Sequence, residues 1–208
     1  ATRISINPQT FSDEVLRNIG RRHTAQDILD CYRTPRRVGH DNINMDLIAG
    51  LPQDSVEGFR DSLEEVLALR PENITVHTLA MKKGSRLMEE GGALPSGEET
   101  ARMVDLSLEA LEGAGYRPYY LYRQKYMSGG LENVSWCLPG TENHYNIIMM
   151  EELQSVLSLG AGGVTKLVDR SSGRIVRLTN PKYPHDYLAM SAKVLEQKDE
   201  ILRFYREV

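Results

Sequence analysis

Short apolar runs and longer amphipathic segments alternate along the first half of the chain. The runs are rich in β-branched residues and have strand length, whereas the longer segments repeat apolar residues at helical spacing. We predict strands at residues 3–6, 43–49 and 73–79, and helices at about 12–38, 55–70 and 97–113. Strands and helices in this order are typical of βαβ units with a parallel sheet, which makes the fold class α/β.

Local signals mark the ends of two of these helices. Asp54 with Glu57, and Ser96 with Glu99, have the spacing of capping boxes, and Pro71 ends the first of the two helices. The apolar stripe of the second helix is expected on Ala101, Val104, Leu108 and Leu111.

Each of the three predicted strands carries polar residues on one of its two faces. Because side chains alternate across a strand, these positions are Ser5, Asn7 and Gln9, then Asn44 and Asp46, then Thr75 and His77. A parallel sheet covered by helices on both sides would have two apolar faces. Two interpretations remain. One is an open sheet with water on one side. The other is a closed or partly closed barrel whose inner wall binds a polar ligand.

The carboxyl ends of the strands are where a βα barrel places its site. Gln9, Asp46 and the Ala80-Met81 turn lie at or near these ends. Gly50 begins a Gly-Leu-Pro turn, and a glycine lets the backbone approach a neighbour closely where the chain leaves the strand. An aspartate on the inner wall suits a ligand that is rich in hydroxyls or amines.

The pattern changes at Tyr116. Residues 116–127 are aromatic and cationic and predict one more strand, and residues 128–146 are rich in loop formers. Residues 149–159 predict an apolar helix or strand.

A hairpin and a terminal helix are expected near the end of the chain. Two strand-like runs flank Ser171-Ser172-Gly173, and the helix begins at about His185. The apolar face of this helix is predicted on Leu188, Ala192, Leu195, Leu202 and Tyr205. We therefore expect a partial βα barrel at 1–127 and a C-terminal α+β domain at 128–208.

Composition and charge argue against some classes of binding partner. The chain has 208 residues, is 40% hydrophobic and carries a net charge of −4, which argues against nucleic acid as a main partner. No apolar run approaches the roughly 20 residues that span a bilayer, so no membrane partner is expected. The two cysteines, Cys31 and Cys137, stand far apart and form neither a disulfide framework nor a metal site. A reducing cytoplasm is the expected location.

Several segments carry a family resemblance. They are RISINPQT (3–10), GRRHT (20–24), NINMDLIAGLPQDSVEGF (42–59) and LRPENITVHTLAM (69–81). Together they resemble the radical S-adenosylmethionine (SAM) enzymes of the oxygen-independent coproporphyrinogen III oxidase type. The later stretch YYLYRQKYM…ENVSW…LGAGGVTK resembles the branch of that family found in anaerobic and Gram-positive bacteria. The similarity covers essentially the whole chain.

The resemblance implies a fold and a set of site residues. It implies the second half of a radical SAM (βα)6 partial TIM barrel, followed by the α+β appendage. The SAM contacts of the family correspond to Gln9, Arg21, Asp46 and Ala80. A Gly-x-Gly turn near the family's active site corresponds to Gly160 and Gly162, with Thr165 and Lys166 as further possible contacts.

One family feature is missing from this sequence. The CxxxCxxC-type loop that holds a [4Fe–4S] cluster is absent, and two distant cysteines cannot supply its thiolates. We expect a fragment whose cluster ligands and electron-donor contacts lie in a missing N-terminal part, and which is inactive by itself. The strand at 3–7 would then be an unpaired edge, and we predict a non-physiological dimer through it.

The resemblance also implies a reaction. The full-length parent would oxidatively decarboxylate coproporphyrinogen III to protoporphyrinogen IX in haem biosynthesis, with the tetrapyrrole gripped by residues such as Tyr120 and Arg123. The alternative is a haem-binding chaperone, since the same superfamily group contains such proteins. Those are typified by a His-Asn pair ahead of a Tyr-Trp, and the run at 143–146, NHYN, does not fit that pattern. This favours the enzyme.

Simpler roles stand beside these assignments. Asp46 could bond to neighbouring backbone or pair with Arg21, and His77 could be a hydrogen-bonded core histidine rather than a catalytic one. Tyr120 and its aromatic neighbours could be ordinary strand packing. Cys137 is expected to be a loop thiol without a role.

Overall fold

The computed structural model describes residues 2–80, 93–122 and 130–207. These residues divide into two compact units, 1–142 and 143–208, and each is described here by itself. No helix in the described ranges is long and apolar enough to cross a membrane.

Unit 1 is built on a five-stranded sheet. Its strands are β1 (Ile4–Gln9), β2 (Ile43–Ala49), β3 (Asn73–Thr78), β4 (Arg117–Tyr122) and β5 (Asn133–Cys137). The spatial order is β1-β2-β3-β5-β4. The first three strands are parallel, as predicted, whereas β5 runs antiparallel to both of its neighbours. The sheet is open, with β1 and β4 at its edges, and pairing of β1 with a second copy stays a prediction.

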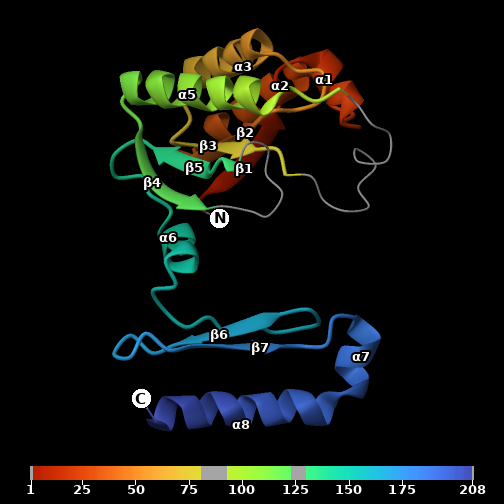
Figure 1. Ribbon diagram of the computed structural model, residues 1–208, viewed down its shortest axis with the longest axis vertical. Coiled ribbons are helices and arrows are strands. Elements are labelled where there is room, and N and C mark those ends of the chain that lie inside the picture. The colour runs from red at the N-terminus through yellow and green to blue at the C-terminus, as the bar shows by residue number, and fades with distance from the viewer. Residues whose placement is uncertain (1, 81–92, 123–129, 208) are drawn as a thin grey trace. The chain divides into compact units, whose positions relative to one another are not determined.

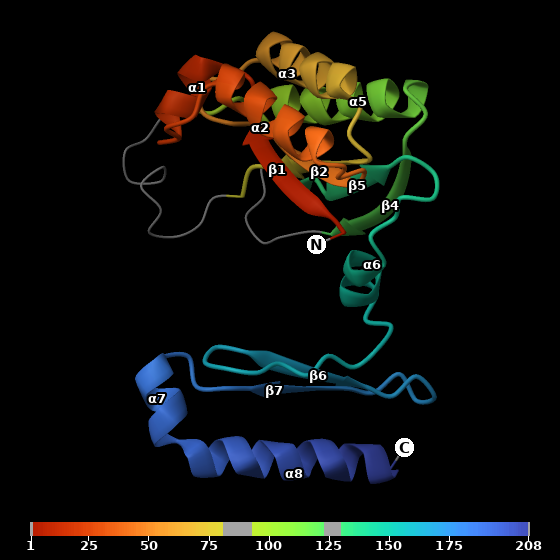
Figure 2. The same cartoon turned by 180° about the vertical axis from the view of Figure 1, so that it is seen from behind.

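Four helices of unit 1 lie on one side of this sheet, as Figures 1 and 2 show from opposite directions. They are α1 (Asp13–Asn18), α2 (Ala25–Arg37), α3 (Val56–Leu69) and α5 (Gly97–Gly113). The helix-facing side chains of β2 are fully buried: Ile43, Met45, Leu47 and Ala49. They pack in one hydrophobic cluster with residues of the helices, among them Leu16, Ile28, Phe59 and Met103. The alternation of the strand residues therefore separates an apolar face under the helices from a polar face opposite.

The helix predicted over 12–38 is in fact two helices. The chain turns between α1 and α2, where Gly20 has a φ of +76° that a helix cannot contain. Thr24 then starts α2 with a capping box, because its hydroxyl accepts from the Asp27 amide while the Asp27 carboxylate accepts from the Thr24 amide.

The start of α3 also differs from the prediction. Ser55, not Asp54, is the N-cap, and its hydroxyl accepts from the Gly58 amide. Asp54 instead accepts from the Ser55 amide at 2.8 Å, and burial raises the pKa of its carboxyl group. The capping box predicted for Asp54 and Glu57 is therefore wrong.

The start of α5 is as predicted, but its buried face is not. Ser96 and Glu99 form the expected capping box. The residues buried on this helix are Thr100, Met103, Ser107 and Leu111. Leu108 is 36% exposed, so the stripe predicted through it is wrong at that position.

Gly50 lets the Thr100 side chain of this helix approach the turn after β2 closely. It has a φ of +83°, and a Cβ built on it would lie 3.0 Å from the Thr100 side chain, so this is the close approach expected at the turn.

The strand β5 lies in the segment predicted to be loop-rich. It fills the place between β3 and β4, with Thr75 opposite Ser135. Because β5 belongs to the sheet, unit 1 extends to residue 142. The boundary predicted after residue 127 lies outside the described residues. Cys137 ends this strand and is buried, so it is not a loop thiol. Burial raises its pKa to about 11.

Unit 2 consists of a hairpin and helices. Its elements are α6 (His144–Met150), β6 (Val164–Val168), β7 (Ile175–Thr179), α7 (Pro184–Ala189) and α8 (Ser191–Glu207). The antiparallel β6–β7 pair confirms the predicted hairpin. The apolar segment at 149–159 is mostly irregular, with one isolated bridge from Val156 to Lys166.

The terminal helix of unit 2 is broken and faces a different way from the prediction. It divides at Met190 into α7 and α8. The buried residue of α8 is Phe204, which packs with Leu167 and Leu178 of the hairpin. The predicted apolar face is exposed: Leu188, Ala192, Leu195, Leu202 and Tyr205 all point away from this small core.

Candidate functional site

A row of polar side chains crosses four strands on the sheet face opposite the helices. Asn44 Nδ2 lies 3.5 Å from Ser5 Oγ on β1, and Thr75 donates its hydroxyl to Asn44 Oδ1 at 3.2 Å. The hydroxyls of Thr75 and Ser135 are 2.6 Å apart. Thr75, Asn44 and Ser135 are all at least 96% buried, so these bonds satisfy groups that water does not reach.

A second row runs from β2 to β4. Asn44 Nδ2 donates to Asp46 Oδ1 at 2.7 Å, and the other carboxylate oxygen, Oδ2, lies 3.4 Å from His77 Nε2. His77 Nδ1 is 3.1 Å from the Tyr122 hydroxyl. The Tyr122 ring in turn stacks on Tyr120, with 6.3 Å between ring centroids and an interplanar angle of 12°. Asp46 therefore pairs with His77 rather than with Arg21.

A cavity of about 280 Å³ opens at the carboxyl ends of β1, β2 and β3. Its lining includes Gln9, Ile48, His77, Thr78, Ala80 and Tyr122. Gln9 has a φ of +69° and is 8% exposed, and its amide nitrogen donates to Asn7 O at 3.1 Å. A positive φ at a residue other than glycine is strained, and such strain is often found at binding sites.

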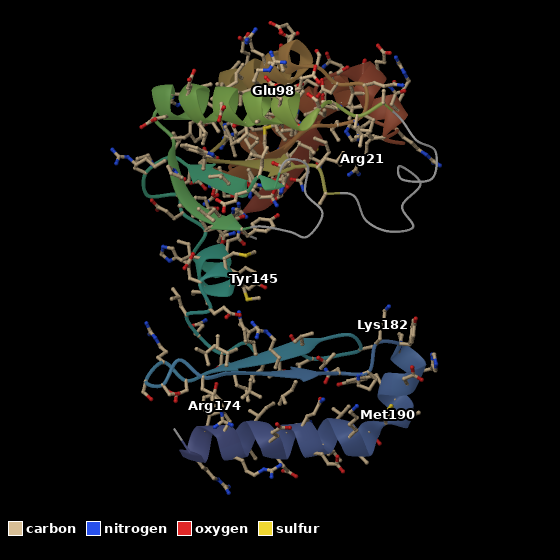
Figure 3. All side chains as sticks on the ribbon, in the orientation of Figure 1. Arg21, Glu98, Tyr145, Arg174, Lys182 and Met190 are labelled. Carbon is tan, nitrogen blue, oxygen red and sulfur yellow. The ribbon has the colours of Figure 1, made fainter. Side chains whose placement is uncertain are left out.

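The structure brings three of the four predicted SAM contacts to this region. Gln9 and Ala80 line the cavity, and Asp46 contacts its lining residue His77. Arg21 lies elsewhere, in the connection after α1, where it is exposed and its amide donates to Leu16 O (Figure 3). No side-chain contact joins it to the cavity in the part of the chain that the structure describes.

The predicted substrate contacts divide between the two units. Tyr120 stands on β4 beside Tyr122, and Arg123 lies outside the described residues. Gly160 and Gly162 belong to a turn of unit 2, with φ values of +87° and +70°. Gly160 O accepts from Asn180 Nδ2 at 2.8 Å, so the turn is held by bonds within its own unit.

Thr165 and Lys166 are also engaged inside unit 2. The Thr165 hydroxyl accepts from the Ser158 amide at 3.0 Å. Lys166 Nζ donates to Met149 O at 3.1 Å and lies 3.3 Å from Glu152 Oε1. Both residues are less than 10% exposed, so the contacts of their polar ends support this unit.

Sequence reasoning missed two contributors to the cavity. The contact of Tyr122 with His77 was not expected, because the two residues lie on strands that do not pair with each other. Asn133 was missed together with β5, and its Oδ1 accepts from the Thr78 amide at 2.8 Å. The alternation of Asn133, Val134, Ser135 and Trp136 was the available signal, since it repeats the polar and apolar faces of the other strands.

The donor set can be tested against the two groups that the resemblance implies. No group of three or more His, Cys, Asp or Glu residues in the described ranges could hold a metal ion. Cys31 and Cys137 cannot complete the thiolate set of a [4Fe–4S] cluster, so these residues do not fit that group. A polar nucleoside fits better. The carboxylate of Asp46 lies next to the lining residue His77. The lining also includes Thr78, whose hydroxyl is buried without a hydrogen-bond partner among the described residues.

Comparison with known proteins agrees with this geometry. Residues 1–66 match the radical SAM superfamily. The solved coproporphyrinogen III oxidase HemN from Escherichia coli aligns with a TM-score of 0.60 at 20% identity, over 79% of this chain and 38% of that one. The class is therefore a radical SAM fold, and the parallel strands β1, β2 and β3 of unit 1 are part of its partial barrel.

Proteins with similar sequences show which radical SAM proteins this chain resembles. The chain is 41% identical over 208 residues to the oxygen-independent coproporphyrinogen-III oxidase-like protein HemZ of Bacillus subtilis, covering 99% of this chain and 41% of that protein. It is 30% identical over 135 residues to the haem chaperone HemW of the same organism, covering 63% and 35%. The chain thus spans less than half the length of these relatives. These relatives confirm the resemblance that the motifs predicted, to the oxygen-independent coproporphyrinogen III oxidases and their radical SAM relatives.

Proposed function

We propose that a protein containing this chain binds SAM in the cavity at the carboxyl ends of β1, β2 and β3. The proposed contacts are Gln9 and Ala80 in the cavity lining, Asp46 next to the lining residue His77, and Arg21 from the exposed connection after α1. The observation that carries the proposal is the convergence of Gln9, Ala80 and the Asp46–His77 pair on one cavity. These residues come from β1, β2 and the end of β3, so their meeting is a property of the fold and not of one motif.

The chemistry of these residues suits a nucleoside. A carboxylate accepts hydrogen bonds from two hydroxyls, as a ribose presents them, and such charge-assisted bonds are strong. The Gln9 amide is fixed by its bond to Asn7 O, which holds it at the rim without further ordering. When bound next to a reduced [4Fe–4S] cluster, SAM supplies a radical that abstracts a hydrogen atom. The cluster ligands and the contacts of its electron donor would lie outside this chain.

The proposed substrate is coproporphyrinogen III. Oxidative decarboxylation turns two of its propionates into vinyl groups. Each propionate loses one CO2, one hydrogen atom to the SAM-derived radical, and one electron to an acceptor outside this chain. The similarity to HemZ over 99% of the chain supports this choice. Tyr120 and Tyr122 would offer stacked aromatic rings and phenol groups to a tetrapyrrole beside the cavity, with Arg123 as a further proposed contact.

A haem-binding role is the second candidate. It is favoured by the similarity to the haem chaperones HemW of Bacillus subtilis and Lactococcus lactis, the latter at 26% identity over 204 residues. In that case the protein would bind haem stably and would not decarboxylate coproporphyrinogen III.

The deciding experiment uses the whole protein that contains this chain, reconstituted anaerobically with iron and sulfide. Three quantities are measured: 5′-deoxyadenosine formed from SAM on reduction, protoporphyrinogen IX formed from coproporphyrinogen III, and haem bound in a titration. Both products together are the expected result. Stable haem binding without decarboxylation would favour the chaperone. A protein that forms neither 5′-deoxyadenosine nor protoporphyrinogen IX and binds no haem would overturn both candidate functions.

Variants test the residues themselves. Asp46→Asn should weaken SAM binding about 10- to 100-fold, because it removes the charge from the hydrogen bonds to the ligand. Asp61→Asn is the matched control, since Asp61 is exposed on α3 under the opposite face of the sheet. Equal weakening in both variants would show that general charge, and not the Asp46 contact, is responsible.

A further inference from the structure

Asp46 is held from two sides in a way that its proposed role does not itself require. Asn44 Nδ2 donates to Oδ1 at 2.7 Å from the same strand, and His77 Nε2 lies 3.4 Å from Oδ2 on the neighbouring strand. The side chain of Asp46 is 18% exposed and that of His77 is 24% exposed. Bonds at this depth restrict a side chain more than bonds on an open surface do, because water competes less for the same groups.

The contact with Tyr122 indicates which ring nitrogen of His77 carries the proton. A phenol at neutral pH is protonated, so the Tyr122 hydroxyl can donate to His77 Nδ1 across the 3.1 Å between them. A neutral imidazole that accepts at Nδ1 carries its proton on Nε2. That proton then faces Asp46 Oδ2. The contacts from Tyr122 through His77 to Asp46 therefore form one continuous chain.

We propose that His77 is a positioning residue for Asp46, and that Tyr122 selects the His77 tautomer that this requires. The inference rests on the proposed SAM site and adds what orients its carboxylate. With Oδ1 held by a hydrogen bond from Asn44 and Oδ2 facing His77 Nε2 at 3.4 Å, the carboxylate is restricted before the ligand arrives. Binding then loses less side-chain entropy, which is the general advantage of a preorganised site.

The geometry separates this role from simple packing. His77 stands on the polar face of β3, whereas its neighbours Ile74 and Val76 belong to the core under the helices. It also lines the cavity, together with Tyr122. A packing role would be served equally well by an aromatic ring without nitrogen atoms, and this difference can be measured.

The test measures binding rather than turnover. The whole reconstituted protein is titrated with S-adenosylhomocysteine, which lacks the reactive sulfonium, in the wild type and in variants. His77→Phe should weaken binding about 10- to 100-fold, the size expected for a lost hydrogen bond to a charged group. His77→Gln should recover most of the affinity, because its amide nitrogen can take the place of Nε2. Tyr122→Phe should weaken binding only a few-fold.

Two exposed residues supply matched controls. His185 forms a pair with Asp186 at 3.0 Å on α7, but its side chain is 80% exposed. His185→Phe should leave binding unchanged, and so should Tyr205→Phe on α8, where Tyr205 is 51% exposed. Thermal unfolding of each variant shows whether the fold is kept.

A second measurement reports on the tautomer directly. The ¹⁵N shifts of the His77 ring should show protonation at Nε2 in the wild type and a mixture of tautomers in Tyr122→Phe. Wild-type affinity in a folded His77→Phe variant would overturn the positioning role and leave the SAM site intact. The same holds for an Nδ1-protonated ring in the wild type. If the wild type binds neither SAM nor S-adenosylhomocysteine, the SAM site itself is overturned, and the positioning role with it.

Discussion

The two units of this chain differ greatly in how many apolar side chains they bury. Unit 1 packs the helix-facing side of its sheet under four helices and buries one continuous cluster that includes Leu47, Phe59 and Ile74. Among the residues that the structure describes, the buried apolar side chains of unit 2 are Leu167, Leu178 and Phe204, whereas Leu159, Leu188 and Leu195 are more than half exposed. Small units bury a smaller fraction of their surface and are correspondingly marginal. The comparison teaches that regular helices and strands do not by themselves make a stable core.

The polar networks of the two units differ in the same sense. In unit 1 the polar side chains join four strands of one sheet, from Ser5 to Ser135. In unit 2 the corresponding bonds are local, such as those around Asp169 in the hairpin turn. A cavity with candidate chemistry is found where the network crosses many strands.

The strongest way to break this comparison is to separate the units. The 143–208 segment alone should show no cooperative unfolding in urea, because three buried apolar side chains cannot offset the entropy of ordering it. The 1–142 segment should unfold cooperatively. Circular dichroism against urea concentration measures both. A cooperative transition in 143–208, with a slope expected for its size, would contradict the comparison.

Substitution of one leucine in each unit tests the same comparison within the intact chain. Leu47→Ala removes a fully buried side chain from unit 1 and should lower the free energy of unfolding by about 3–5 kcal/mol. Leu202→Ala removes one that is 56% exposed on α8 and should change it by less than about 0.5 kcal/mol. Chemical denaturation of the chain gives both values. A loss of several kcal/mol in Leu202→Ala would show that this side chain is covered.

The polar face of unit 1 should show a smaller but specific effect. Thr75→Val deprives Asn44 and Ser135 of a buried partner and should cost about 1–3 kcal/mol of unfolding free energy. Adding Ser135→Ala removes one of the stranded groups and should restore part of that loss. Strictly additive losses in the double variant would argue against a shared network.

The smallest expected effect concerns pH and unit 2. Hydrogen bonds from Ser172 and Ser171 lower the pKa of the Asp169 carboxyl group to about 2. A carboxyl whose pKa is lowered by folding stabilises the fold above its unfolded pKa of about 4, and that contribution is lost as pH falls towards 2. Replacing both serines by alanine should raise the Asp169 pKa towards its ordinary value. A ¹³C titration of its carboxyl carbon would show this, and an unchanged midpoint would contradict it.

The sequence by itself determined the elements whose signals are local. The alternation in residues 43–49 predicted both faces of β2, and the cap at Ser96 and Glu99 predicted the start of α5. The motifs around Gln9, Asp46 and Ala80 identified the family, and the fold then brought these residues to one end of the sheet.

Only the tertiary structure decided which distant residues meet. The strand β5 lies between β3 and β4, and its pairing with β3 joins residues that are more than 50 positions apart in the sequence. No local period encodes that pairing. The inward face of α8 depended in the same way on what the chain packs against. The Asp46–His77–Tyr122 chain spans three strands, so its geometry exists only once the sheet has assembled. Periodicity is a property of neighbours along the chain, whereas a site is a property of neighbours in space.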